Sequence, residues 1–189
     1  MTADNLLSGV VGGIIGGLCS VAAVLVQNYL NRRNQIESEK KLVKSVLQAI
    51  RAEVKTLWGR YYETVGKRLA ELRFDQPFPG YWLVSQDYFT VYTSNASLLG
   101  RVENQELRLL IVQTYTLAKA MVDSFRINNE MNQRYEDARL HFEQTKLSVY
   151  QDSAVAFHKQ RVDYAETLKD SHTKLKDHVE RLLRAIDEG

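Results

Sequence analysis

The residues of this chain best suited to catalysis or metal binding are its four histidines and its single cysteine. His141, His158, His172 and His178 stand in no HExxH pattern, and the chain has no paired CxxC, no GxSxG and no GxxxxGK sequence. His172 and His178 are six residues apart, so on a helix they face different directions. A metal site would need ligands from several helices, and Cys19 has no second cysteine in the chain. The sequence therefore predicts no catalytic residue, no metal and no cofactor, and it favours a protein that is not an enzyme.

Two rows of small residues near the N-terminus are the strongest functional signal. They lie in Asn5 to Asn31, a stretch without a charged side chain, and at about 1.5 Å per residue Leu6 to Leu30 can cross a hydrocarbon core of roughly 30 Å. Small residues let helix backbones approach closely in lipid, so we expect copies to associate here as a glycine zipper. Residues 1–31 are thus predicted to form a transmembrane anchor. The predicted association residues are Ser8, Gly9, Gly12, Gly13, Gly16, Gly17 and Ser20.

A cleaved signal peptide is the main alternative for this segment. Signal peptides have a positive n-region and a short apolar stretch before the cleavage site. Here Asp4 is the only charged side chain before the apolar run, and the run is longer than a typical h-region. The pattern favours an uncleaved span.

Basic residues directly after the span predict its orientation. Arg32, Arg33, Lys40 and Lys41 follow closely, and such residues stay on the cytoplasmic side and are attracted to anionic lipids. We therefore expect a single-pass protein with its N-terminus outside, its C-terminal domain in the cytoplasm, and these four residues at the membrane surface. Beyond Arg68 the charges nearly balance, so no nucleic-acid partner is expected.

Residues 32–189 carry apolar residues mostly three and four apart, which is the spacing of amphipathic helices. The stripes predict three helices, over 34–72, over 104–150 and from Asp152 to Ile186. The first would be continuous unless Gly59 or Gly66 bends it, and the second would have Asn104 as its N-cap. The fold class is therefore all-α: the transmembrane helix continues into a cytosolic antiparallel bundle of three long helices, with a coiled coil between stalks of associated copies.

An antiparallel order fixes which connection lies near the membrane. The first helix would lead outward, the second return and the third lead out again, so the turn at 150–153 would lie near the bilayer and the connection over 73–103 at the distal end. That connection is rich in aromatic residues. They would either cap the end of the bundle, with Ser85 starting a short helix, or bind a partner. The candidate partner surface consists of Phe78, Tyr81, Trp82 and Tyr88.

The stretch from Tyr88 to Asn129, YFTVYTSNASLLGRVENQELRLLIVQTYTLAKAMVDSFRINN, resembles a segment of small single-span bacterial membrane proteins of unknown function. The resemblance implies a bacterial inner-membrane protein and carries over no site residue. Within it, Asn95 fits turn or helix-cap chemistry. Three further polar residues lie beside apolar faces: Asp123, Asn128 and Asn129. We expect them to be surface residues or to form hydrogen bonds between helices.

Two functions are consistent with these features. The first is a non-enzymatic scaffold or adaptor that associates with itself through the glycine-rich span, touches membrane lipids and binds a cytosolic protein partner. The alternative is an effector of a bacterial stress or phage-defence system, in which assembled spans perturb the bilayer.

Overall fold

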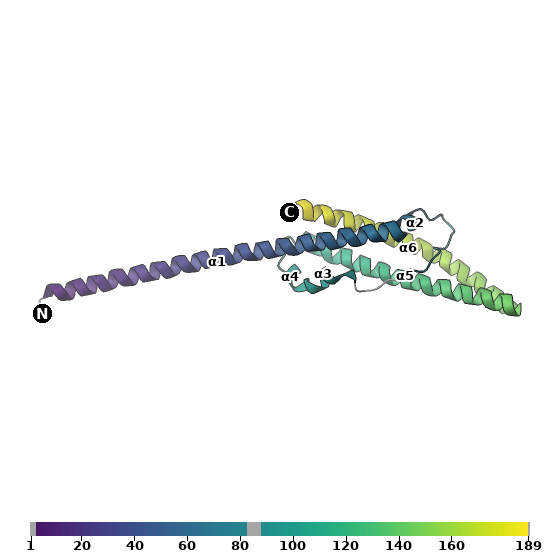
Figure 1. The fold of residues 1–189 in the computed structure, drawn as a ribbon, viewed down its shortest axis with the longest axis horizontal. Helices are drawn as coiled ribbons and strands as arrows, with labels where there is room; N and C mark the ends of the chain where they lie inside the picture. Colours follow the sequence, from purple (N-terminus) through teal and green to yellow (C-terminus); the bar gives the residue numbers. More distant parts are fainter. Residues whose placement is uncertain (1–2, 83–87, 189) are drawn as a thin grey trace. The chain divides into compact units, whose positions relative to one another are not determined.

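The computed structural model describes the backbone of residues 3–82 and 88–188 and the side chains of residues 24–82 and 88–188, and in that part it is helical without a strand. The long helices are α1 (Ala3–Tyr61), α5 (Gln105–Thr145) and α6 (Ser148–Glu188) (Figure 1). A π-helical turn, Tyr62–Gly66, and α2 (Lys67–Ala70) extend α1. The short helices α3 (Thr90–Ser94) and α4 (Ala96–Leu99) precede α5. The prediction of an all-α fold is confirmed.

The chain forms two compact units, Met1–Ser45 and Val46–Gly189. In the first unit, the predicted span up to residue 23, including all seven association residues, lies outside the part whose side chains are described. In the part of the chain whose residues are described, none of the helices is sufficiently long and apolar to cross a membrane. Of the apolar stripe predicted from Ile36 onward, Ile36 is 48% exposed in this unit and Val43 is half-buried.

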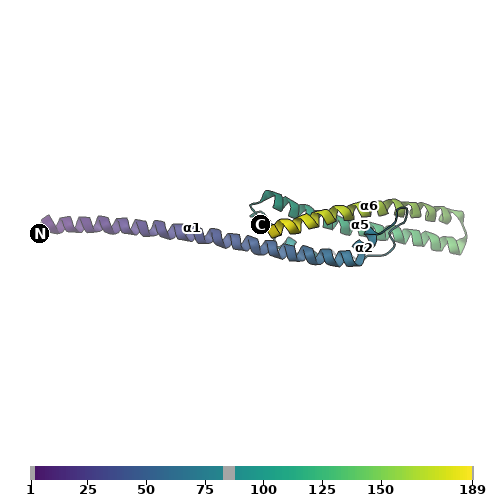
Figure 2. The ribbon, with the colours of Figure 1, turned by 90° about the horizontal axis from the view of Figure 1, so that it is seen from above.

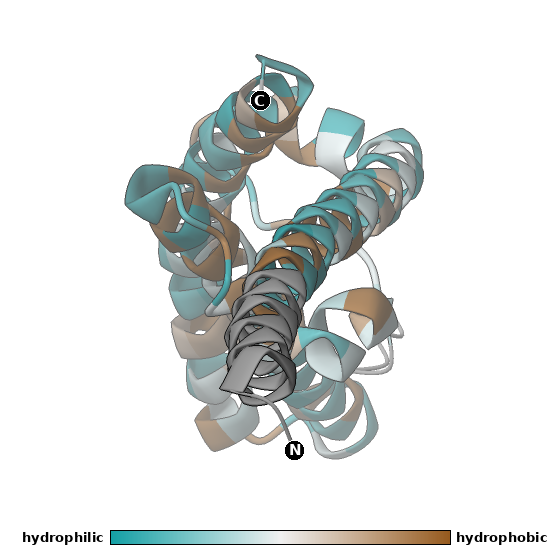
Figure 3. Cartoon of the chain, turned by 90° about the vertical axis from the view of Figure 1, so that its left-hand side faces the viewer, coloured by the Kyte–Doolittle hydropathy of each residue, from teal (hydrophilic) through white to brown (hydrophobic). Residues whose placement is uncertain are grey.

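In the second unit, the last part of α1 packs beside α5 and α6. Each of these helices alternates hydrophilic and hydrophobic residues along its length (Figure 3), and the apolar ones form the core. Ile50, Ile111, Leu168 and Leu182 are fully buried. The core therefore draws on all three helices.

The contacts between these helices correct the predicted order of directions. Arg51 in α1 donates to Asp187 near the end of α6 (2.9 Å), whereas Tyr61, ten residues later, lies beside His172; α1 and α6 are thus antiparallel. Tyr115 contacts Glu53, and Phe125 contacts Tyr61 (ring centroids 6.2 Å apart), so α5 runs parallel to α1. The expectation that the second helix returns along the first was wrong.

The physical reason is the long connection between α2 and α5, which travels back along α5 before that helix begins. Trp82 is hydrogen-bonded to Asn129, and Tyr92 stacks on Tyr115 with ring centroids 4.0 Å apart. The connection therefore brings the chain back to the level at which α1 enters the domain, and α5 must run in the same direction as α1. It lies beside the helices instead of capping a distal end. Ser85, the expected start of a short helix, lies outside the described residues, and helix α3 begins at Thr90.

The turn between the last two helices lies earlier than predicted. Lys146 adopts a left-handed conformation (φ 58°) and donates its N–H to the carbonyl of Phe142 (2.8 Å), which ends α5. Tyr150 and Ser153 belong to α6. The other end of α5 is as predicted, because the Asn104 side chain accepts the Leu107 N–H (3.0 Å) as an N-cap.

Beyond the level of α2, α5 and α6 continue as a two-helix hairpin (Figure 2). We call residues 133–160 the arm. Ring contacts of Tyr135 with His158 and of His141 with Tyr150 join its two helices.

Candidate functional site

An apolar cavity lies in the second unit, between α1, α5, α6 and the returning connection. Its cavity volume is about 120 Å³, and it opens to solvent. An apolar cavity of about 150 Å³ is large enough to bind benzene, so this one has room for about one aromatic ring. The described lining comes from α1 (Val54, Leu57, Trp58, Arg60, Tyr61), the connection (Trp82, Tyr88, Phe89), α5 (Thr114, Tyr115, Ala118, Met121, Val122, Phe125) and α6 (Leu175, Val179).

Aromatic rings form much of the cavity wall. Trp82 stacks on Phe125 with centroids 5.5 Å apart and an interplanar angle of 21°, and Tyr61 lies 6.1 Å from Trp82 and 5.3 Å from Trp58. Such tilted and stacked pairs add about 0.5–1.5 kcal/mol each beyond their buried area. The wall is therefore held in shape by its own ring contacts.

Trp82 is fixed at this wall by an amide of α5. The Asn129 side chain accepts the Trp82 backbone N–H (3.1 Å) and donates to the Trp82 carbonyl (2.7 Å), so it satisfies both backbone groups of one residue. The sequence suggested that Asn129 is a surface residue or bonds another helix, but in the structure it bonds the connection. It positions the tryptophan.

Glu53 ties the connection to α1 at the other side of the cavity. Its carboxylate accepts the N–H of Val91 (2.7 Å), the N–H of Tyr92 (3.2 Å) and the hydroxyl of Tyr115 (2.6 Å). Burial and this hydrogen bond raise the pKa of Tyr115 above the ordinary value for tyrosine. Sequence reasoning missed Glu53, although its position among Ile50, Val54 and Leu57 on the apolar stripe was a signal.

His172 is the one histidine drawn into the core. It is 4% exposed, its Nδ1 lies 2.8 Å from the Tyr61 hydroxyl, and its ring stacks with Trp58 (centroids 5.7 Å apart). Burial, with the charge of Lys176 as a second cause, lowers the pKa of His172, so the neutral ring is favoured. Burial also raises the pKa of Tyr61. The pair is a hydrogen bond between neutral groups.

The other histidines are not gathered into a site. His141 and His158 are exposed on the arm, and His178 approaches the Lys174 carbonyl of its own helix with Nδ1 at 2.9 Å. In the part of the chain whose side chains are described, no group of three His, Cys, Asp or Glu residues is placed to hold a metal ion.

A buried polar layer separates the cavity region from the arm. Asn132 donates to the Gly80 carbonyl (3.1 Å) and accepts from Nε of Arg161 (2.7 Å), whose guanidinium lies 4.4 Å from the centre of the Tyr135 ring. Asn128 also approaches the Gly80 carbonyl (3.4 Å). These bonds hold the connection against α5, so Asn128 has a structural role, as a hydrogen bond between elements.

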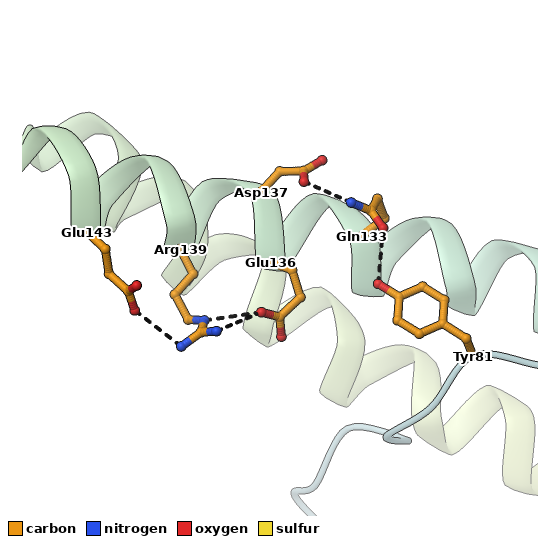
Figure 4. Close-up of polar contacts among 6 residues, drawn as sticks. All are labelled: Tyr81, Gln133, Glu136, Asp137, Arg139 and Glu143. Carbon is orange, nitrogen blue, oxygen red and sulfur yellow. Dashed lines mark hydrogen bonds and ion pairs between the residues drawn. The ribbon is translucent and has the colours of Figure 1, made fainter.

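The four residues of the predicted partner surface do not share one surface. Phe78 is 3% exposed and belongs to the core, where its ring is 5.9 Å from that of Phe125. Tyr81 is 57% exposed and donates to Gln133 of α5 (3.3 Å; Figure 4). Trp82 and Tyr88 line the cavity. The aromatic connection is therefore divided between core, surface and cavity wall.

The remaining polar candidates lie at surfaces or helix ends. Arg32, Arg33, Lys40 and Lys41 are exposed, and Arg33 pairs with Glu37 within its own helix at 3.4 Å. Asp123 pairs with Arg126 at 3.4 Å on the exposed side of α5. Asn95 marks the junction of α3 and α4, where its amide donates to the Val91 carbonyl (2.8 Å).

The arm exposes apolar side chains on both of its helices and at its tip. Leu140 is 47% exposed, Leu147 55%, Val149 60% and Val155 67%. Some of the charged residues nearby are paired on α5 itself: Arg139 bonds Glu136 (3.0 Å) and Glu143 (3.2 Å) along one face (Figure 4). The tip of the arm therefore presents exposed apolar side chains beside charged ones.

No protein family, curated protein or solved structure matches this chain.

Proposed function

We propose that this chain is a non-enzymatic adaptor anchored in the bacterial inner membrane. Its N-terminal segment crosses the bilayer once and associates with other copies through the glycine and serine rows. Its helical domain stands on the cytoplasmic side and recruits a protein partner.

The membrane part of the proposal is supported by exposure as well as by sequence. Of the described residues at the end of the predicted span, Val24, Leu25, Val26, Tyr29 and Leu30 are between 49% and 68% exposed. A run of exposed apolar side chains marks a surface that contacts lipid or another chain. The exposed basic residues that follow suit a cytoplasmic membrane surface.

The same reasoning supports association beyond the membrane. Ile36 belongs to the apolar stripe predicted for α1 and remains exposed in the single chain, as does Leu42 nearby. Parallel copies joined through the glycine rows would cover such residues by helix pairing.

The observation that carries the adaptor proposal is the arm. Two helices extend past the end of α1 and α2 and present Leu147 and Val149 at their tip, more than half exposed. Exposed apolar residues bordered by polar ones are typical of a protein-binding surface. A helical projection of this kind suits recruitment of a cytosolic protein.

A site-specific crosslink in native membranes tests the proposal. A photoreactive residue replaces Leu147 at the tip and, as a matched control, Leu109, an apolar residue of α5 that is 56% exposed but lies outside the arm. We expect mass spectrometry to identify a cytosolic protein captured from Leu147 and absent from Leu109. The capture should disappear when Val149 is changed to Glu.

The following results would contradict the adaptor proposal. If Leu147 captures only lipid, or only other copies of the chain, the arm does not recruit a cytosolic partner. Dye leakage from membranes on overexpression, lost with Gly13→Leu, would favour the membrane-perturbing effector instead.

A further inference from the structure

The cavity is not needed by an adaptor that binds through its arm. Protein interiors are close-packed and hold few voids larger than a water molecule. Here three helices and the connection surround a solvent-open cavity of about 120 Å³, several times the volume of one water molecule. A hollow of this size in a small helical domain calls for an occupant.

Three hydroxyl groups of residues around the cavity are already hydrogen-bonded. The Tyr61 hydroxyl pairs with His172, the Tyr115 hydroxyl donates to Glu53, and the Thr114 hydroxyl donates to the Leu110 carbonyl (2.7 Å). These residues therefore offer the cavity ring faces and methyl groups rather than free donors. The interior selects an apolar ligand.

The wall composition further favours a flat ring. Trp58, Tyr61, Trp82, Tyr115 and Phe125 all contribute to the lining. Aromatic side chains stack on planar groups in offset or tilted arrangements. Because Asn129 holds the backbone of Trp82, this wall is fixed before a ligand arrives, which lowers the entropic cost of binding.

The charge that the described lining residues bring to the cavity is positive. Arg60 is the only charged residue in the described lining, and none of the described carboxylates pairs with it. Glu53, the nearby acid, already accepts three hydrogen bonds of 3.2 Å or less. An anionic group on the ligand would find an exposed guanidinium and no carboxylate among the described lining residues.

We propose that this cavity binds a small planar aromatic anion, with its ring system against Trp82 and Phe125 and its anionic group at Arg60. Such a site is separate from the arm and gives the helical domain a place for a small molecule. A ligand there would occupy the junction of α1, α5 and α6.

Two dyes with one ring skeleton test the proposal on the full chain in phosphatidylcholine vesicles. Anilinonaphthalene sulfonate carries an anionic group, and phenylnaphthylamine lacks it. Both tryptophans of the chain, Trp58 and Trp82, line the cavity, so dye emission on tryptophan excitation reports binding there above the signal of dye dissolved in lipid. We expect saturable binding of the sulfonate, about three- to fivefold tighter than that of the neutral dye, as an exposed ion pair supplies.

Matched variants locate the site. Ala118→Phe places a ring in the cavity and should abolish saturable binding, whereas Ala120→Phe, at an exposed position of the same helix, should not change it. Arg60→Gln should weaken the sulfonate about three- to fivefold and leave the neutral dye unchanged. Arg126→Gln, at an exposed position of α5, is its control.

Each outcome decides the proposal. Binding that survives Ala118→Phe, or no saturable signal in the wild type, overturns the site. Equal weakening of both dyes by Arg60→Gln, or by Arg126→Gln, overturns the anionic specificity. Circular dichroism of each variant shows whether it is folded, and if Ala118→Phe fails to fold, the Arg60→Gln comparison alone decides.

Discussion

Replacing Glu53 by alanine removes the carboxylate that joins α1 to the connection and to α5. The first turn of α3 has no capping side chain of its own at Phe89, and Glu53 takes that role from another helix by accepting the N–H groups of Val91 and Tyr92. The same carboxylate accepts the hydroxyl of Tyr115, which is 2% exposed. One substitution thus breaks a helix cap and a buried hydrogen bond together.

The expected loss follows from these two parts. A buried hydroxyl left without an acceptor costs about 1–3 kcal/mol. A lost helix cap costs about 1 kcal/mol. We therefore expect Glu53→Ala to lower the free energy of unfolding by about 2–4 kcal/mol, which corresponds to a fall in Tm of about 5–15 °C. Denaturant and thermal unfolding of the full chain in detergent, followed by circular dichroism, measure both quantities.

A control and a double variant separate this explanation from a general effect of losing a charge. Glu63→Ala removes an exposed glutamate that follows the same helix and should change stability by less than about 0.5 kcal/mol. Tyr115→Phe removes the orphaned hydroxyl, so it should cost about 1–2 kcal/mol less in the Glu53→Ala background than in the wild type. Equal effects of Glu53→Ala and Glu63→Ala, or no coupling with Tyr115, would refute the reasoning.

Three further perturbations test the packing, the titration and the association. Gly66→Ala should destabilise the domain by about 1–3 kcal/mol, because a new Cβ would come within 3.1 Å of aromatic ring atoms, whereas Gly59→Ala, with open space around it, should be neutral or stabilising; unfolding curves compare the two. The pKa of His172 is lowered, so the folded state favours its neutral form, and the free energy of unfolding should fall as the pH drops below about 6.5. His172→Gln should flatten this dependence and His141→Gln should leave it unchanged; an unaltered profile in the first variant would contradict the assignment. Gly13→Leu fills the predicted small-residue face and should reduce oligomers seen by crosslinking in membranes, and an unchanged oligomer distribution would exclude that face as the contact.

Local patterns were sufficient to predict the elements of this fold. The three- and four-residue spacing of apolar side chains predicted the long helices, and Asn104 was recognised as an N-cap because its side chain needs only the N–H of Leu107, three residues away. The end of α5 was placed too late, because Lys146 carries no glycine-like signal for the left-handed conformation that it adopts.

The candidate site was only partly accessible from the sequence. Trp82 and Tyr88 were selected for their aromatic character, and both line the cavity. Phe78 was selected on the same ground and is buried, because composition does not show which rings face inward. Glu53 and His172 were missed since their partners, Tyr115 and Tyr61, lie 62 and 111 residues away in the chain.

By itself, the sequence determined which segments are helical and that an uncharged, glycine-striped run precedes a basic flank, because these properties depend on side chains a few positions apart. Only the tertiary structure decided that α5 runs parallel to α1, that α5 and α6 extend together as an arm, and that a cavity lies beside Trp82. Helical periodicity is the same in either direction along an axis. The direction of α5 is set by contacts such as Asn129 with Trp82 and Glu53 with Tyr92. These contacts join residues far apart in the chain and bring the connection back to the level at which α1 enters the domain.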